Sequence, residues 1–184
     1  MSSTRSARLL LASLFLAGAS AHAEQAVTLL GLGSSIPDAW QLETPSSDMR
    51  LLQSAIPAAD GDAAAFVVFY FGPEQGGTLE ANVERWQSQF QGPEGTAVEP
   101  RISEIGTAAL PATLVELRGS YGRSVGMGPG GDMLPDRMLL AAVVETPEGT
   151  LYPQLHGPAM LVAEQRDAFI AFVRGLQPAA TPRP

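Results

Sequence analysis

The most constraining feature of this 184-residue chain is the continuous apolar run Phe66–Phe71, which Gly72-Pro73 closes. The run is rich in β-branched and aromatic residues and too short for a free-standing helix, so it predicts a strand covered on both faces. After the turn, apolar residues recur at intervals of four, three and four: Leu79, Val83, Trp86 and Phe90. This spacing predicts an amphipathic helix that begins after an N-cap at Thr78 and ends at Gly92-Pro93.

The turn Gly72–Gly77 has the outline of a phosphate-binding loop, because it joins a strand to a helix and has glycines at both ends. The lysine of that motif, which neutralises the phosphates, is replaced by Thr78, and Glu74 adds the wrong charge. We therefore interpret the turn as an ordinary glycine-rich connection. Beside the apolar stripe, Asn82, Arg85 and Gln89 are interpreted either as a polar strip that recognises a ligand or as ordinary flanking residues.

Residues 1–23 have the pattern of a cleaved signal peptide. Arg5 and Arg8 precede the apolar segment Leu9–Ala19, and Ala21-His22-Ala23 fits the cleavage-site rule. We expect a mature chain that starts at Glu24 and is exported, either to the periplasm or to the extracellular space. No later stretch is long enough to span a membrane, which needs about 20 apolar residues. The chain has no cysteine and therefore no disulfide or cysteine-linked lipid anchor.

The charge is strongly negative. The chain has a formal net charge of −8, and removal of residues 1–23, which carry two arginines and no acidic residue, lowers it to about −10. Nucleic acids and anionic lipids repel such a surface, so we expect no nucleic-acid partner. This charge fits a soluble monomer, or a partner that carries a basic patch. Because a complete fold pattern comes without a catalytic set, we expect a domain that binds a protein partner or a small ligand.

The remaining chain predicts one domain over residues 24–178, followed by a disordered tail at 179–184. A turn at Ile36–Trp40 should bring Trp40 back onto the core. The strand Thr113–Tyr121 should be half-exposed, with Glu116 and Arg118 on its outer face. A second amphipathic helix is expected between Pro158 and Gly175. The other expected strands are Val27–Leu32, Met49–Ile56, Arg101–Ile105, Met138–Val144 and Leu151–His156. This pattern favours an α+β fold: a mainly antiparallel sheet with a helix packed on each face, an α/β/α sandwich.

The longest irregular segment is Gly119–Asp136, which is rich in glycine and lies between two strands that pair as a hairpin. Connections of this length are usually functional or disordered. One hypothesis is a mobile flap that closes on a ligand, with Arg118, Arg123 and Arg137 as anion contacts and Tyr121 at its stem. A flexible loop without a specific role has equal weight.

No catalytic constellation is apparent. His156 is the only histidine left after signal removal, and no serine lies in a Gly-x-Ser-x-Gly elbow. We therefore expect no metal and no cofactor, and favour a non-enzymatic exported domain. The alternative is a hydrolase that uses His156 or a carboxylate pair near the Gly119–Asp136 segment.

Several of these features occur together in one known family. Pro37 to Trp40, a strand that ends at Phe71, Asn82 with Arg85-Trp86 on the following helix, and a final helix after Gly157-Pro158 resemble the PsbP-like group, in particular uncharacterised exported bacterial proteins of that type. The resemblance implies an α/β/α sandwich on an antiparallel sheet and a binding or assembly role. A photosynthetic function is not implied, because the family's metal-binding and photosystem-docking residues have no counterpart here.

Overall fold

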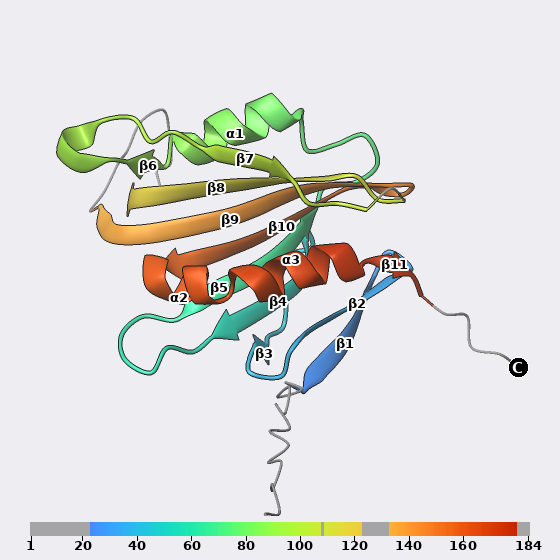
Figure 1. The fold of residues 1–184 in the computed structure, drawn as a ribbon. Coiled ribbons are helices and arrows are strands. Elements are labelled where there is room, and N and C mark those ends of the chain that lie inside the picture. Colours follow the sequence, from blue (N-terminus) through green and yellow to red (C-terminus); the bar gives the residue numbers. More distant parts are fainter. Residues whose placement is uncertain (1–22, 108, 123–132, 180–184) are drawn as a thin grey trace, which may run out of the picture.

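The fold is built on an antiparallel sheet of eight strands (Figure 1). The computed structural model describes residues 23–107, 109–122 and 133–179. The strand order is β3-β4-β5-β10-β9-β8-β6, and β7 also pairs with β8. The strands are β3 (Gln41–Leu42), β4 (Arg50–Ile56), β5 (Ala64–Tyr70), β6 (Phe90–Gln91), β7 (Arg101–Glu104), β8 (Ala112–Tyr121), β9 (Leu134–Thr146) and β10 (Gly149–Pro158).

Helices lie on both faces of this sheet. Helix α1 (Leu79–Gln87) packs on one face, and α2 (Ala159–Glu164) and α3 (Arg166–Gly175) pack on the other. A second sheet, of β1 (Glu24–Leu29), β2 (Leu32–Pro37) and β11 (Gln177–Pro178), lies beside α3 (Figure 1). A short 3₁₀ helix, η1 (Pro93–Gly95), follows β6. The expected α+β fold with a mainly antiparallel sheet is confirmed.

The main core lies between the sheet and α2–α3. Phe66 on β5 is fully buried at its centre, with ring centroids 4.8 Å from Trp40, 6.0 Å from Phe169 and 5.0 Å from Phe172. Trp40 is completely buried, as the sequence predicted, and its indole N–H donates to Oε1 of Gln165 at 2.9 Å. These aromatic contacts fix the N-terminal segment and the C-terminal helices to the same sheet face.

A smaller core lies under α1 on the opposite face. Its buried members come from α1, β6, the segment before β7 and the centre of the sheet: Trp86, Phe90, Val98, Val115, Leu117, Leu139, Ala141 and Tyr152. Helix α1 has nine residues and contacts β8. Because a helix is about 10 Å wide and strands lie about 4.8 Å apart, one helix covers roughly two strands. The strands β10, β5 and β4 are therefore only partly covered on this face.

The first helix ends earlier than the sequence predicted. It stops at Gln87 with Ser88 as its C-cap, and Phe90 lies in β6, opposite Tyr121. Thr78 is the N-cap as predicted, and its hydroxyl accepts from the Ala81 N–H at 3.2 Å. Phe90 reaches the core under α1 from a strand, so the apolar spacing is satisfied by two elements instead of one.

The predicted C-terminal helix is divided in two at Gln165, which is the C-cap of α2 and the N-cap of α3. The predicted strand Val27–Leu32 was also wrong, because the chain turns there through Leu30 and Gly31, both with positive φ, into the β1–β2 hairpin. Ala179, expected in the tail, donates its N–H to the Gly31 carbonyl at 2.8 Å. Residues 180–184 lie outside the described residues.

The strand β8 is not half-exposed as predicted. Glu116 is buried, and its carboxylate accepts from Arg166 Nε at 3.1 Å and from Nη2 at 2.9 Å. Helix α3 packs on this face of the sheet, and its first residue is Arg166. The arginine pairs with the Glu116 carboxylate, and this pairing allows a charged side chain to be buried between the strand and the helix. None of the helices in the described part of the chain has the length and apolarity needed to cross a bilayer.

Candidate functional site

The partly covered face of the sheet holds a groove beside α1. Its larger part, of about 310 Å³, is lined by Arg50, Ala65, Val67, Phe69, Gln89, Tyr121, Leu139, Gln154 and His156. A smaller hollow of about 220 Å³ shares four of these residues and adds Phe71, Arg85 and Trp86. We call the two together the β5–β10 groove, because β5 and β10 form most of its floor.

Strand alternation places these side chains. Phe66 and Val68 point into the main core, whereas Ala65, Val67 and Phe69 point into the groove. The register then aligns Val67 with Gln154 and Ala65 with His156 on β10. The predicted cover on both faces of the run Phe66–Phe71 is therefore complete on one face and partial on the other, where Val67 is buried and Phe69 is half-buried. Figure 1 places α1 at the β8 end of the sheet, away from β4 and β5.

The apolar surface of the groove is mainly aromatic. The Phe69 and Phe71 rings, two residues apart on one strand face, are half-buried, lie 6.1 Å apart and are parallel to within 4°. Phe71 also contacts Tyr152, with centroids 5.5 Å apart. Half-exposed parallel rings leave flat apolar surface facing solvent, which a flat apolar ligand can cover.

Arg85 lines the groove from α1 and is held in place by Asn82. The Asn82 amide nitrogen donates to the carbonyls of Gly76 and Thr78, both at 2.8 Å. These two bonds fix the amide, so that Oδ1 faces Arg85 and accepts from its Nη2. Asn82 is completely buried. The interpretation of Asn82 as a ligand contact was therefore wrong, because it is a positioning residue, whereas Arg85 does line the groove.

Arg50 lines the groove from β4 and was not singled out in the sequence. Its guanidinium carbon lies 5.3 Å from the Phe69 ring centroid, and its Nη1 donates to Oε1 of Gln53 at 2.8 Å. The register brings Arg50 opposite Phe69. An arginine at the start of an otherwise apolar strand was the available signal, but only strand pairing shows which aromatic ring it covers.

His156 and Tyr121 form the other side of the groove. Their ring centroids lie 4.2 Å apart, and Tyr121 also contacts Phe90 at 5.3 Å. The sequence predicted both residues as candidates, one for catalysis and one for binding, and the structure brings them together. Among the described residues that line this part of the groove, none is a serine, threonine, aspartate or glutamate.

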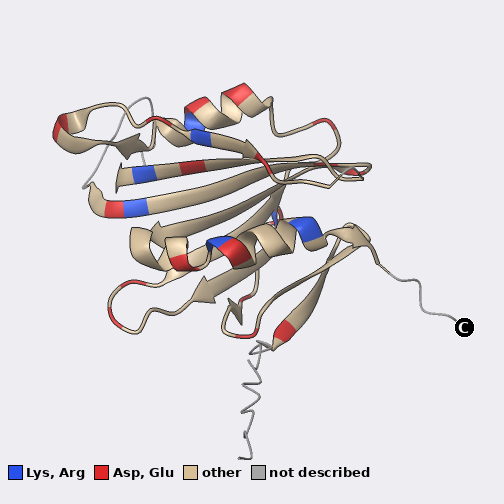
Figure 2. Ribbon diagram, in the orientation of Figure 1, with Lys and Arg blue, Asp and Glu red and all other residues tan. Residues whose placement is uncertain are grey.

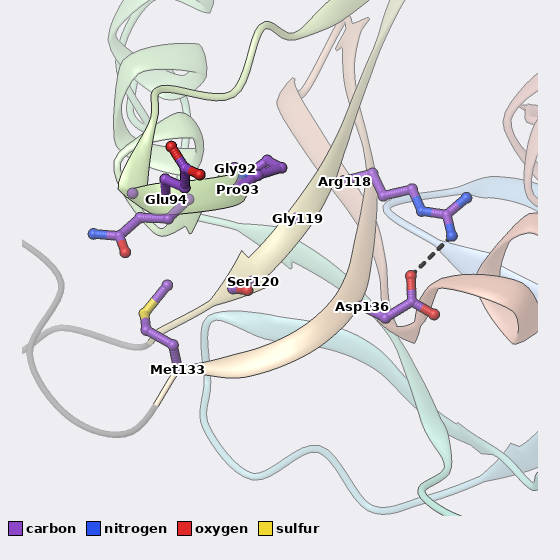
Figure 3. A pocket seen from close by; sticks show the side chains of 10 residues that line it. Gly92, Pro93, Glu94, Arg118, Gly119, Ser120, Met133 and Asp136 are labelled. Atoms are coloured by element: carbon purple, nitrogen blue, oxygen red, sulfur yellow. Dashed lines mark hydrogen bonds and ion pairs between the residues drawn. The ribbon is translucent and has the colours of Figure 1, made fainter.

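The other predicted anion contacts are not brought together. Arg118 lies on β8 beside a separate hollow of about 470 Å³, where Nη2 contacts Asp136 Oδ1 at 2.8 Å (Figure 3). Arg137 lies on β9, pairs with Asp62 and is mostly buried. Both belong to strands, because β8 extends to Tyr121 and β9 begins at Leu134. Arg123, with the rest of 123–132, lies outside the described residues.

The groove differs from the rest of the molecule in charge. Figure 2 shows basic and acidic residues distributed over several strands and helices. Three described arginines each pair with a carboxylate: Arg118, Arg137 and Arg166. The hydrogen bonding of the Arg166 guanidinium to the Glu116 carboxylate, which accepts, raises the pKa of Arg166 above its usual value, against a smaller opposing effect of burial. Within the part of the chain that the structure describes, Arg50 and Arg85 contact no carboxylate, and no cluster of three metal-ligating side chains occurs.

The fold and groove together define an α+β domain with an antiparallel sheet, helices on both faces and one incompletely covered face. No family model matches the chain, and no curated protein matches it. Among solved structures, the chain is similar to a protein of unknown function, PA94 from Pseudomonas aeruginosa. The identity is 20%, the TM-score is 0.47, and the match covers 88% of this chain and 98% of that one.

Proposed function

We propose that this protein is a non-enzymatic, exported binding domain that holds a small ligand in the β5–β10 groove. The observation that carries the proposal is the groove itself: aromatic rings and side-chain amides on a rigid sheet, with two arginines that contact no carboxylate among the described residues. Ligand sites are typically concave and mostly apolar, with a few placed polar groups.

A small ligand fits this groove better than a protein partner does. The larger part has a volume of about 310 Å³, at the lower end of the range for small-molecule sites. A protein partner would need an interface of about 800 Å² on this chain. The large apolar side chains that are more than 40% exposed, Leu42, Met49, Ile102, Leu134 and Met160, lie on different elements and do not line the groove.

Export to the cell envelope is part of the proposal, as are a monomeric state and the PsbP-like relationship. The first strand begins at Glu24, directly after the expected cleavage site. Cleavage there would remove one described hydrogen bond, from Asp38 N–H to the Ala23 carbonyl at 3.0 Å. Mass spectrometry of the protein from the envelope fraction should give an N-terminus at Glu24. Recovery of the uncleaved chain from the cytoplasm would contradict export.

The experiment for the groove compares two tryptophan variants. Ala65 is an exposed residue of the groove, and Ala163 is an exposed residue of α2 on the other side of the sheet. Ala65→Trp fills the groove, whereas Ala163→Trp adds the same side chain elsewhere. After incubation with an envelope extract, native mass spectrometry should show a bound small molecule on the wild type and on Ala163→Trp, but not on Ala65→Trp. Equal binding by Ala65→Trp would contradict the proposal.

The alternative hydrolase has a separate readout. A panel of ester and amide substrates should give no turnover above background with the wild-type protein. Turnover by the wild type that disappears in a folded His156→Ala variant would contradict the non-enzymatic binding domain and support the hydrolase.

A further inference from the structure

The residues that line the β5–β10 groove indicate the chemical class of its ligand, and this inference rests on the proposed function. The first observation is electrostatic. The chain has 19 acidic and 11 basic residues, yet none of the described residues that line the groove is acidic, and two are arginines. A concavity whose described lining is cationic and holds no carboxylate attracts anions selectively in an acidic protein.

The second observation is that both arginines are held by neutral groups. Asn82, whose amide is fixed by two backbone carbonyls, orients Arg85, and Gln53 with the Phe69 ring orients Arg50. Neutral partners restrict the conformation of each guanidinium without neutralising its charge. Binding of a ligand therefore costs little further side-chain entropy. Among the described residues, the Arg85 guanidinium makes one hydrogen bond and keeps most of its five N–H donors, whose fork geometry suits a carboxylate.

The third observation concerns the ligand's body. Arg85 shares its hollow with Phe69, Phe71 and Trp86, so a ligand on the guanidinium also touches aromatic surface. Side-chain amides of Gln89 and Gln154 line the same hollow, and within the described residues neither makes a side-chain hydrogen bond. With volumes of about 220 and 310 Å³, the space suits one or two fused rings but no extended chain.

We propose that the β5–β10 groove binds a small organic carboxylate with a flat ring system of one or two rings. Its ring lies against Phe69 and Phe71, and its carboxylate accepts from Arg85. Arg50 adds positive potential at the other end of the Phe69 ring. Gln89 and Gln154 bind polar substituents on the ring edge.

The test uses the full chain and three probes of one shape: 2-naphthoate, the neutral 2-naphthalenemethanol and the cationic 2-naphthylmethylammonium. Isothermal titration calorimetry gives the affinities, and amide chemical shifts show whether binding is at β5 and β10. We expect naphthoate to bind about tenfold more tightly than the alcohol, which is the effect of one charge-assisted contact of about 1.4 kcal/mol. The cation should bind most weakly. Raising the salt concentration should weaken naphthoate binding and leave alcohol binding unchanged.

Two arginine variants locate the anion contact. Arg85→Gln should remove the tenfold preference for naphthoate, and Arg85→Lys should restore part of it. Arg101→Gln is the matched control, because Arg101 is an exposed arginine on β7 that contacts no carboxylate among the described residues. It should behave as the wild type. Urea denaturation of each variant confirms that the fold is intact.

Failure of the anion assignment and failure of the ligand groove give different results. If the alcohol or the ammonium compound shifts the β5 and β10 amides and binds as tightly as naphthoate, the groove binds ligands but the anion assignment is wrong. If Arg101→Gln loses the preference as Arg85→Gln does, the carboxylate is not at Arg85. If none of the three probes shifts these amides, the ligand groove itself is contradicted.

Discussion

Replacing Asn82 by alanine should destabilise the whole domain, because this residue holds the start of α1 from inside the protein. The substitution removes two hydrogen bonds of 2.8 Å to the carbonyls of Gly76 and Thr78, and a third from Arg85. A typical bond contributes about 1 kcal/mol net, and a buried acceptor that stays unpaired costs more. The Thr78 carbonyl stays paired in the variant, because it also accepts from the backbone N–H of residue 82 at 3.1 Å. The expected loss of unfolding free energy is therefore about 2 kcal/mol.

Urea denaturation followed by circular dichroism measures this loss. With a slope of about 2 kcal/mol per molar urea, the midpoint should fall by about 1 M. Ser88→Ala is a suitable control, because Ser88 is exposed at the opposite end of the same helix and its hydroxyl donates to the Arg85 carbonyl at 2.8 Å. That change should lower the midpoint by less than half as much. A urea midpoint of Asn82→Ala equal to that of the wild type would refute the positioning role of Asn82. It would favour the interpretation of this residue as part of a polar strip that contacts a ligand.

Two further substitutions test the packing on the two faces of the sheet. Gly76→Ala should cost about 2–4 kcal/mol, because φ is +100° and the added methyl would overlap the Tyr152 hydroxyl; thermal denaturation measures the loss, and an unchanged melting temperature would contradict it. Arg166→Ala leaves the Glu116 carboxylate, 9% exposed, without its cation, and because Arg166 itself is 38% exposed we expect about 2 kcal/mol, less than for a fully buried pair. The double variant Glu116→Leu, Arg166→Leu should recover most of that loss in urea denaturation. Because Glu116 raises the pKa of Arg166, the stability that this pair contributes is fully present below the unfolded-state pKa of Arg166 and is lost as pH rises through the folded-state pKa. The loss of unfolding free energy in Arg166→Ala should therefore not change between about pH 7 and 9. A loss that becomes smaller over that range would contradict this account.

The chain order of elements could be predicted from the sequence where one local rule decides. The run Phe66–Phe71 predicted β5, and Thr78 predicted the start of α1. The predictions were wrong where tertiary pairing competes with local pattern. Phe90 has helical spacing but lies opposite Tyr121 in a strand, and Glu116 has the alternation of an exposed residue but lies under Arg166.

The residues of the candidate site were also predicted only in part. Arg85 and Tyr121 were predicted as binding residues and both line the groove, whereas Arg50 and Gln154 were missed. Arg50 is 35 residues before Arg85 and 104 before Gln154 in the chain, so no spacing rule connects them. The strand order β4-β5-β10 places Arg50 and Gln154 on one face of the sheet, and the packing of α1 on that face adds Arg85.

By itself, the sequence determined which residues are apolar on both sides of a strand, and hence that a sheet with helices on both faces would form. It did not determine how far each helix extends over that sheet. The tertiary structure decided this: α1 is nine residues long and contacts β8, so it covers one end of its face. Coverage depends on the width of a helix relative to eight paired strands, a property of the assembled layers. The part that α1 does not cover, with Phe69, Phe71, Arg50 and Arg85 around it, is the β5–β10 groove.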